Sequence, residues 1–389
     1  MTKVNPEIET FARIKVIGVG NSGTNSVNHM IRSKVRNIDF IAIDTDAQKL
    51  HISLAPKKIH IGKNVTKGLG GGMNPEMGKR AAEETKEAIQ EALKGADMVF
   101  IACGKGGATG TGASPVIAKI AKEQGILTIA VVTKPFSFEG AQRSRLAEAG
   151  LVNLRESVDA MIVIPNDRLL SIVNKDTTFL SAFQMCDDVL KQAVEGISDL
   201  ITMPGIINVD FADVRTIMQN AGSALMGIGL GQGEKRAEDA AKMAVNSPLL
   251  DISIEGARGV LFAISGGPDI TMVEVQNAAN IITQSIDPDA KVIFGTINDE
   301  RLKKGEIKVT VIATGFPENR IAKKPSLFQN TINQDGKETI KERMARDERD
   351  IFRDSLSPKD STNQDKNKDG KDKDDDSWDV IPAFLRRNR

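Results

Sequence analysis

Two glycine-rich segments constrain what this chain can fold into more than any other feature of its sequence. Residues 18–23 and residues 104–112 each follow a continuous apolar run rich in β-branched side chains, and each precedes a helical pattern. Such runs are typical of strands buried on both faces of a parallel sheet. The repeated order of strand, glycine loop and helix therefore predicts an α/β fold with a Rossmann-like parallel sheet covered by helices.

The same alternation extends along most of the chain. In the first half, strands are expected at residues 13–19, 38–44, 57–62, 96–104, 126–133 and 159–165, and helices at residues 25–33, 74–95, 113–125 and 140–157. A long helical pattern covers residues 176–203, and a second, smaller α/β unit follows it. The expected strands of that unit are residues 259–265, 291–297 and 307–315, and its helices lie near residues 234–246 and 271–285.

Charge and cysteine content argue against several classes of protein. The 52 Lys and Arg residues balance the 52 Asp and Glu residues, so the chain lacks the basic excess of a dedicated nucleic-acid binder. Cys103 and Cys186 belong to no CxxC motif, which predicts two reduced core thiols. His29, His51 and His60 lack zinc-ligand spacing, so no protein metal cage is expected. Without an apolar leader or an apolar run of about 18 residues, a cytoplasmic location is expected.

The first glycine loop fits the pattern G-x-G-x-x-G at Gly18, Gly20 and Gly23. Small residues let the backbone approach a phosphate, and the helix N-terminus behind them favours its negative charge. Asp44 closes the next strand about 20 residues later, as in dinucleotide-binding folds. A phosphate site is predicted here, and an NAD-dependent oxidoreductase is an open alternative.

The second glycine loop is denser and favours a different ligand. Residues 104–112 contain five glycines and two threonines, so successive N–H groups can form an anion-binding nest. Thr109 and Thr111 can add hydroxyl donors to phosphate oxygens; a flexible turn is the plainer alternative. A dinucleotide enzyme has no need of a second phosphate loop, whereas a nucleoside di- or triphosphate benefits from two. The motif G-x-x-x-x-G-K-[ST] is absent, which excludes a P-loop nucleotide hydrolase.

The motif GGATGTG at residues 106–112 resembles the glycine-rich signature GGGTGTG of the tubulin/FtsZ family. Further segments resemble that family in the same order: TKPFSFEG at 133–140, IPNDRLL at 164–170, DDVLKQAVEGISDLIT at 187–202, NVDFADVRTIM at 208–218, GSALMGIG at 222–229 and DVIPAFLRRNR at 379–389. The resemblance covers residues 12–316 and resumes at the C-terminal end. It implies a GTP-binding domain, a long central helix, a second smaller α/β domain and a disordered tail.

This resemblance implies that the ligand is GTP or GDP, with Mg²⁺ held mainly by the nucleotide phosphates. It places nucleotide contacts at Gly20, Asn21, Ser22, Gly23, Thr24, Asn25, Gly104, Gly106, Gly107, Ala108, Thr109, Gly110, Thr111, Gly112, Glu139, Arg143, Asn166 and Asp187. Asn166 and Asp187 match positions that contact the sugar and the guanine. A carboxylate can accept hydrogen bonds from both N1–H and N2–H of guanine, which adenine lacks, so GTP is expected over ATP.

The resemblance also implies that Asn208, Asp210 and Asp213 form a catalytic loop on the far side of the subunit from its own nucleotide. In a head-to-tail filament this loop enters the next subunit's site, where the two carboxylates polarise the attacking water. Asp210 also suits a plainer role as the cap of a helix beginning at Phe211 or Ala212. The predicted function is a polymerising GTPase of the bacterial division ring that hydrolyses GTP between subunits.

Several positions depart from the family pattern. Asn21 and Ser22 stand where most relatives have glycine, Ala108 replaces the middle glycine of GGG, and Asp44 replaces a common Asn. Asn tolerates left-handed backbone better than other non-glycine residues. Lys105 replaces a usual Met and adds a charge near the site; it is expected to lie in solvent, and stronger phosphate binding is the alternative. These changes leave open a non-hydrolysing scaffold of the same fold, which would bind GTP without turnover.

Composition changes after Phe316. Residues 317–376 are rich in Lys, Asp, Asn, Gln and Ser, which is typical of a disordered linker. The predicted organisation is a flexible N-terminus at 1–10, a GTP-binding domain at 11–175, a central connecting helix at 176–203, a C-terminal activation domain at 204–316, a disordered linker at 317–376 and a partner-binding peptide at 377–389.

The C-terminal peptide has the character of a short linear motif that folds into a partner's groove. The residues expected to bind a partner are Asp379, Ile381, Pro382, Phe384 and Leu385. The resemblance implies that these partners are cell-division adaptor proteins. Contact with the membrane would then be indirect, at a mid-cell ring beneath it.

Overall fold

The computed structural model describes residues 12–170, 177–247, 253–299 and 301–316. The predicted N-terminal segment at 1–10, the linker at 317–376 and the partner-binding peptide at 377–389 lie outside the described residues. No helix among the described residues is both long enough and apolar enough to cross a membrane.

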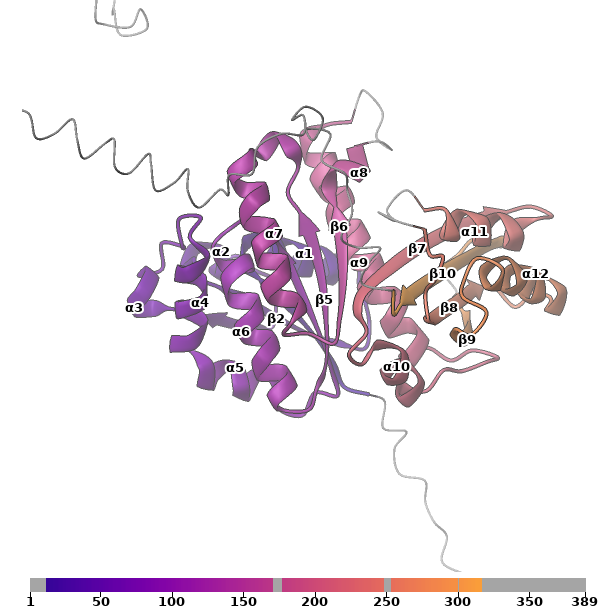
Figure 1. The fold of residues 1–389 in the computed structure, drawn as a ribbon, viewed down its shortest axis with the longest axis horizontal. Helices are drawn as coiled ribbons and strands as arrows, with labels where there is room; N and C mark the ends of the chain where they lie inside the picture. The colour runs from indigo at the N-terminus through magenta and orange to yellow at the C-terminus, as the bar shows by residue number, and fades with distance from the viewer. Residues whose placement is uncertain (1–11, 171–176, 248–252, 300, 317–389) are drawn as a thin grey trace, which may run out of the picture. The chain divides into compact units, whose positions relative to one another are not determined.

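The described strands form one 10-stranded sheet with helices packed on it (Figure 1). The strands are β1 Ile14–Val19, β2 Ile38–Asp44, β3 Lys57–His60, β4 Met98–Gly104, β5 Leu127–Lys134, β6 Ala160–Pro165, β7 Gly222–Gln232, β8 Gly259–Gly266, β9 Lys291–Asn298 and β10 Glu306–Thr314. Their order across the sheet is β3-β2-β1-β4-β5-β6-β7-β10-β8-β9. Neighbours from β3 to β7 are parallel, β10 is antiparallel to β7 and β8, and β9 is parallel to β8. The predicted α/β class and the smaller second unit are confirmed.

Helices alternate with these strands along the described residues. They are α1 Gly20–Arg32, α2 Ala47–His51, α3 Lys63–Thr66, α4 Pro75–Glu84, α5 Lys86–Leu93, α6 Thr109–Glu123, α7 Ala141–Arg155, α8 Asn166–Leu170, α9 Phe179–Thr202, α10 Phe211–Met218, α11 Arg236–Val245 and α12 Met272–Thr283, with a 3-10 turn at Ser137–Glu139. Successive side chains of β4 point to opposite faces. Phe100 packs in the cluster that contains Val27 of α1 and Leu190 of α9, whereas Ile101 packs with Ile117 of α6. Burial on both faces explains why β4 is apolar throughout.

The helix predicted at residues 74–95 is wrong in one respect, because the structure divides it at Thr85 into α4 and α5. The Thr85 hydroxyl donates to the Ala81 carbonyl at 3.1 Å and accepts from the Gly62 N–H at 3.2 Å. A side chain that bonds the backbone in this way competes with the helical hydrogen-bond ladder. The break therefore has a local cause that apolar periodicity does not reveal.

The sequence patterns did not predict β7, although it joins the two halves of the sheet. It pairs with β6 at Ala160, Met161 and Ile162 and with β10 along most of its length. Its alternate residues Gly227 and Gly229 face α11. A Cβ atom at either glycine would lie 1.9 Å from a helix carbonyl oxygen. These glycines, which resemble a loop in sequence, let the backbone of α11 lie directly on the strand.

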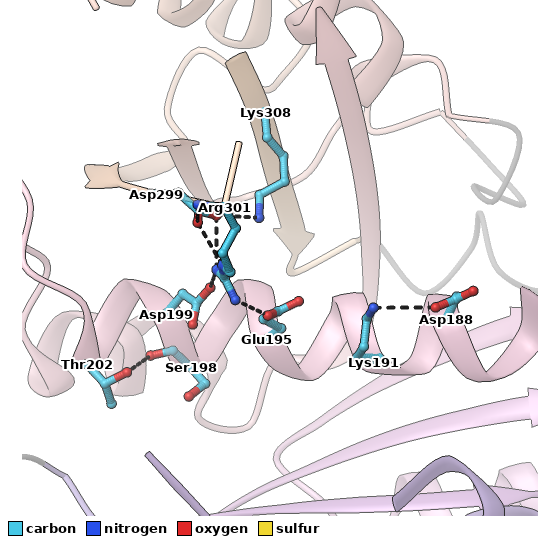
Figure 2. A network of polar contacts seen from close by, with 9 residues as sticks. All are labelled: Asp188, Lys191, Glu195, Ser198, Asp199, Thr202, Asp299, Arg301 and Lys308. Atoms are coloured by element: carbon cyan, nitrogen blue, oxygen red, sulfur yellow. Dashed lines mark hydrogen bonds and ion pairs between the residues drawn. The ribbon is translucent and has the colours of Figure 1, made fainter. Parts of the chain in front are cut away.

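Arg301 ties the C-terminal half of α9 to the smaller unit (Figure 2). Its guanidinium donates to Asp199 Oδ2 and to Asp299 Oδ1, each at 2.7 Å, and also to Glu195. Lys308 Nζ lies 3.4 Å from the same Asp299 carboxylate. Burial raises the pKa of Asp199, and the bond from Arg301 opposes that shift. This end of α9 is therefore held by charge pairs as well as by apolar packing.

Candidate nucleotide-binding site

A cavity of about 680 Å³ lies at the carboxyl ends of the parallel strands. Ligands of open α/β sheets bind at this edge. Of the residues predicted to contact a nucleotide, those that line the cavity are Gly20, Asn21, Ser22, Asn25, Gly104, Gly107, Ala108, Thr109, Gly110, Glu139, Arg143, Asn166 and Asp187. Residues from positions 20 to 187 of the sequence thus converge on one space of the size that small-molecule ligands occupy.

The first glycine loop is the first turn of α1, because the helix begins at Gly20. Gly20 has a φ of +72°, whereas neither Asn21 nor Ser22 has a positive φ. Only Gly20 therefore needs the freedom of glycine, and the departures from the family pattern at the next two positions cost no backbone strain. Gly23 does not line the cavity. A Cβ there would lie 2.2 Å from the Ala102 carbonyl oxygen, so Gly23 lets α1 pack on β4.

The second glycine loop divides into residues that face the cavity and residues that shape the loop. The Gly106 N–H donates to Thr111 Oγ1 at 2.9 Å, so that hydroxyl is engaged within the loop. A Cβ at Gly112 would lie 1.8 Å from the Pro75 carbonyl oxygen, so Gly112 permits close packing of α4 on α6. Gly106, Thr111 and Gly112 thus do not line the cavity. Ala108 does, and its methyl group faces Gly71, where an added Cβ would lie 2.5 Å away.

Lys105 does not lie in solvent, and that expectation is wrong. The residue is 3% exposed, although it belongs to a loop at the cavity. Burial lowers the pKa of its ammonium. Sequence alone could not show on which side of the loop backbone this long side chain would lie.

One end of the cavity carries the groups predicted to bind the base and the sugar. The Ser26 hydroxyl donates to Asp187 Oδ1 at 2.6 Å, and burial raises the pKa of that carboxyl. Phe183 stands one turn before Asp187 on α9 and also lines the cavity. Thr24 Oγ1 is buried without a hydrogen-bond partner among the described residues, but Thr24 does not line the cavity. Asn166 does line it, and its buried Oδ1 also has no hydrogen-bond partner among the described residues. An acceptor left unsatisfied at a cavity wall favours a ligand that donates to it.

At the cavity mouth, Arg143 and Glu139 form an ion pair of 2.8 Å. Asp44, the residue that suggested a dinucleotide site, is 2% exposed. Its Oδ1 accepts from the N–H of Thr45 at 2.7 Å and from the N–H of Asp46 at 3.3 Å. Asp44 therefore stabilises the turn after β2 through Oδ1, whereas its buried Oδ2 has no hydrogen-bond partner among the described residues, and Asp44 lines the cavity.

Sequence reasoning missed a third loop that lines the cavity, residues 70–73. Its signal was present in the run Gly68-Leu69-Gly70-Gly71-Gly72, in which Gly70 and Gly72 have positive φ values. The run follows no apolar strand of its own, so the strand-loop-helix pattern did not mark it. Thr45 was missed as well; its hydroxyl lies 2.7 Å from the hydroxyl of Thr109.

Cys103 and Cys186 are buried free thiols, as expected. Cys186 also lines the cavity. Burial raises the pKa of its thiol to about 12, which keeps it protonated and unreactive at neutral pH.

None of Asn208, Asp210 and Asp213 lines the cavity. They follow α9, whose N-terminal part carries Asp187, and in Figure 1 α8 is drawn above α9 whereas α10 is drawn below it. Asp210 caps α10 by accepting from the Asp213 N–H at 2.7 Å, which confirms the plainer role considered for it. Asn208 accepts from the Gly205 N–H at 2.8 Å and is exposed.

Comparison with known proteins gives matches over both units. Residues 13–174 match the model of the GTPase domain of the Tubulin/FtsZ family, and residues 222–317 match the model of the C-terminal domain of the FtsZ family. The chain is similar to an FtsZ from M. jannaschii solved as an empty dimer, with 45% sequence identity and a TM-score of 0.75. That match covers 79% of this chain and 89% of the other.

Two proteins from Haloferax volcanii share the fold at lower identity. CetZ1, solved as a GDP-bound monomer, is 19% identical with a TM-score of 0.69, over 79% of this chain and 95% of the other. CetZ2, solved as a protofilament with GTPγS bound, is 20% identical with a TM-score of 0.68, over 88% of this chain and 100% of the other.

Proposed function

Because the chain belongs to the tubulin/FtsZ family, we propose that it binds GTP in this cavity and hydrolyses it as a subunit of a head-to-tail filament. The observation that carries the proposal is the separation of two halves of a catalytic site. The phosphate loops and Asp187 converge on the cavity, whereas the carboxylates of Asp210 and Asp213 lie beyond the other end of α9.

The unpartnered polar atoms of the cavity support a nucleotide as its ligand. A ribose hydroxyl would satisfy Asn166 Oδ1, which has no hydrogen-bond partner among the described residues. The first turns of α1 and α6 both begin at the cavity, so their free N–H groups and helix dipoles favour phosphate. Two helix N-termini at one cavity suit a ligand with several phosphates.

Asp187 supports guanine as the base. Ser26 occupies one of its carboxylate oxygens, which leaves further acceptor capacity for the N1–H and N2–H of guanine. Phe183 offers an apolar ring beside it. Adenine presents no equivalent pair of donors to a carboxylate.

Mg²⁺ would be held mainly by the nucleotide phosphates, with oxygen atoms of the protein nearby. The described residues contain no group of three or more His, Cys, Asp or Glu side chains suited to a metal ion. The cavity does offer the hydroxyls of Thr45 and Thr109, and oxygen donors are those that Mg²⁺ prefers. The ion would neutralise phosphate charge, while the protein positions the nucleotide.

The length of α9 supports hydrolysis between subunits. Fifteen helical steps from Asp187 to Thr202 span about 22 Å, and none of Asn208, Asp210 and Asp213 lines the cavity of its own chain. The relative from M. jannaschii was solved as a dimer, which supports self-association in this family. In a head-to-tail contact, the loop of one chain would complete the cavity of the next.

The decisive experiment is phosphate release from Mg-GTP over a range of protein concentrations. Activity per chain that is near zero in dilute protein and rises above a threshold concentration supports a shared site. Constant activity per chain would contradict the roles of Asp210 and Asp213. GTP binding with no phosphate release at any concentration would instead favour the non-hydrolysing scaffold.

The proposed cellular setting is the cytoplasmic side of the division site, with adaptor proteins bound to residues 377–389 and only indirect contact with the membrane. The single Trp of the chain, Trp378, belongs to this peptide, and the chain has no Tyr. Trp fluorescence therefore reports the peptide selectively. Emission that is unchanged by an adaptor whose binding is established independently would contradict this assignment.

A further inference from the structure

Lys105 is a buried cation that the proposed chemistry leaves without a role. It belongs to the second glycine loop, yet it is 3% exposed. Its Nζ donates to Ser114 Oγ at 2.7 Å and to the Gly110 carbonyl oxygen at 3.3 Å. Lys105 and Gly110 both belong to the lining of the cavity, and these two bonds hold the ammonium against the first turn of α6.

The surroundings of this ammonium do not neutralise it. Its contacts on α6, Ser114 and Gly110, are uncharged, and α7 presents Gly150 beside the Lys105 side chain. Burial lowers the pKa of Lys105, and the thiol of Cys103 on β4 has the smaller, opposite effect of raising it. Among the described residues, no Asp or Glu forms an ion pair with Lys105.

Charged groups beside the loop come from α7 and the turn before it, and from Asp44 and Asp46, which flank Thr45 at the same cavity. The Arg143 side chain lies against Gly106, and its guanidinium forms the 2.8 Å ion pair with Glu139. That acid is therefore already committed to another cation. A lone buried ammonium is costly unless a counter-charge approaches it, and a bound nucleotide would bring several negative charges to the other side of the loop.

We propose that Lys105 is a positioning residue for the nucleotide phosphates, a buried cation whose counter-charge is the diphosphate held on the other face of the loop. The inference rests on the proposed nucleotide site and adds an electrostatic partner to it. The ammonium attracts the phosphates across the loop backbone. It should therefore strengthen binding of the phosphates and leave binding of the base unchanged.

This arrangement couples nucleotide binding to protonation. Burial lowers the pKa of Lys105 in the empty site, and phosphate charge on the other face of the loop would raise it again. Binding of GDP should therefore take up protons at alkaline pH, and GDP affinity should fall as pH rises. Guanosine, which has the same base and sugar without phosphates, should show neither effect.

The experiment measures binding of GDP and of guanosine by calorimetry, in buffers of different ionisation enthalpy, between about pH 6 and about pH 9. It compares the wild-type protein with Lys105→Met, which keeps the length and the apolar contacts of the buried side chain. Lys119→Met, at an exposed position further along α6, removes the same charge elsewhere and is the matched control. Thermal unfolding establishes that each variant is folded.

We expect Lys105→Met to bind GDP about 10-fold more weakly, to lose the linked proton uptake and to bind guanosine as the wild type does. Lys119→Met should behave as the wild type with both ligands. Equal GDP affinity in Lys105→Met, or an equal loss for GDP and guanosine, would overturn the proposal. If Lys105→Met fails to fold, the wild-type measurement still tests the proposal. Identical proton uptake on binding of GDP and of guanosine would overturn the role of Lys105. A wild-type protein that binds neither ligand would refute the nucleotide site itself.

Discussion

The Ser26 hydroxyl donates a 2.6 Å hydrogen bond to the Asp187 carboxylate, joining two residues that stand 161 positions apart in the sequence. Ser26 is fully buried on α1, and its hydroxyl also lies 3.1 Å from the Ser22 carbonyl oxygen. The bond fixes one oxygen of the carboxylate that we assign to guanine. It therefore connects the first glycine loop, at the start of α1, to Asp187 on α9.

Replacing Ser26 with Ala should weaken GDP binding about 10-fold, because a hydrogen bond to a charged group is lost and Asp187 is left less well oriented.

The pH dependence of GDP binding by Ser26→Ala has a definite sign. Asp187 must be ionised to accept from guanine, and burial already raises its pKa, while Ser26 lowers it. Without Ser26 the pKa of Asp187 rises further. As the pH is lowered, Ser26→Ala should therefore lose GDP affinity at a higher pH than the wild type does. Titration of GDP binding against pH checks this, with Ser26→Thr, which retains the hydroxyl, as the control; identical acid profiles for Ser26→Ala and the wild type would contradict it.

Asp213→Asn should bind GDP normally and lose phosphate release by about 100-fold, since it lies outside the cavity and would act only on a neighbour's nucleotide. Its backbone N–H, which the Asp210 cap requires, is unchanged. Mixing it with Asp187→Ala, which has an intact loop and an impaired cavity, should restore activity that neither variant has alone. The measurement is phosphate release at constant total protein. A mixture that only averages its two components would count against a shared site.

Gly229→Ala should destabilise the smaller unit by about 3 kcal/mol, because its methyl group would meet the Ala240 carbonyl oxygen of α11 and force the helix away from β7. Denaturant unfolding of nucleotide-free protein measures the effect. Gly107→Ala is the matched control, since a Cβ there meets no atom within 4 Å. Equal stability of the two variants would show that α11 shifts without cost.

Arg236 should make the smaller unit sensitive to acid. Its guanidinium is 2.6 Å from Glu274 Oε1 and 2.6 Å from Asp269 Oδ2, and its hydrogen bond holds the pKa of Glu274 at about 2. A depressed carboxyl pKa stabilises the folded state above the ordinary value of 4.5, and this contribution is lost as pH falls from 4.5 toward about 2.

Arg236→Met should therefore lower the free energy of unfolding by about 2 kcal/mol at neutral pH and flatten its decline in acid. Denaturant unfolding at several pH values tests both parts. Lys242→Met, on the exposed face of the same helix, is the control and should change stability little. A slope in acid that matches the wild type would exclude the Arg236–Glu274 pair as its source.

Sequence patterns anticipated the largely buried strands β1 and β4, because both are mostly apolar and each ends at a glycine loop. They missed β7, whose glycines serve contact with a helix that lies later in the chain. They also misplaced Lys105, since the direction of a side chain relative to its own loop is a tertiary property. The bond between Ser26 and Asp187 was equally out of reach, because nothing local to either residue indicates the other.

The separation along α9 between the cavity and the loop proposed to be catalytic has a consequence for the number of complete sites in an assembly. A linear assembly of n chains that share their sites head to tail has n cavities and n loops but only n − 1 junctions. One terminal chain keeps its nucleotide beyond the reach of any loop, while the other presents a loop with nothing to act on. The two ends would therefore differ in the nucleotide they carry, and an assembly of identical chains would acquire a direction.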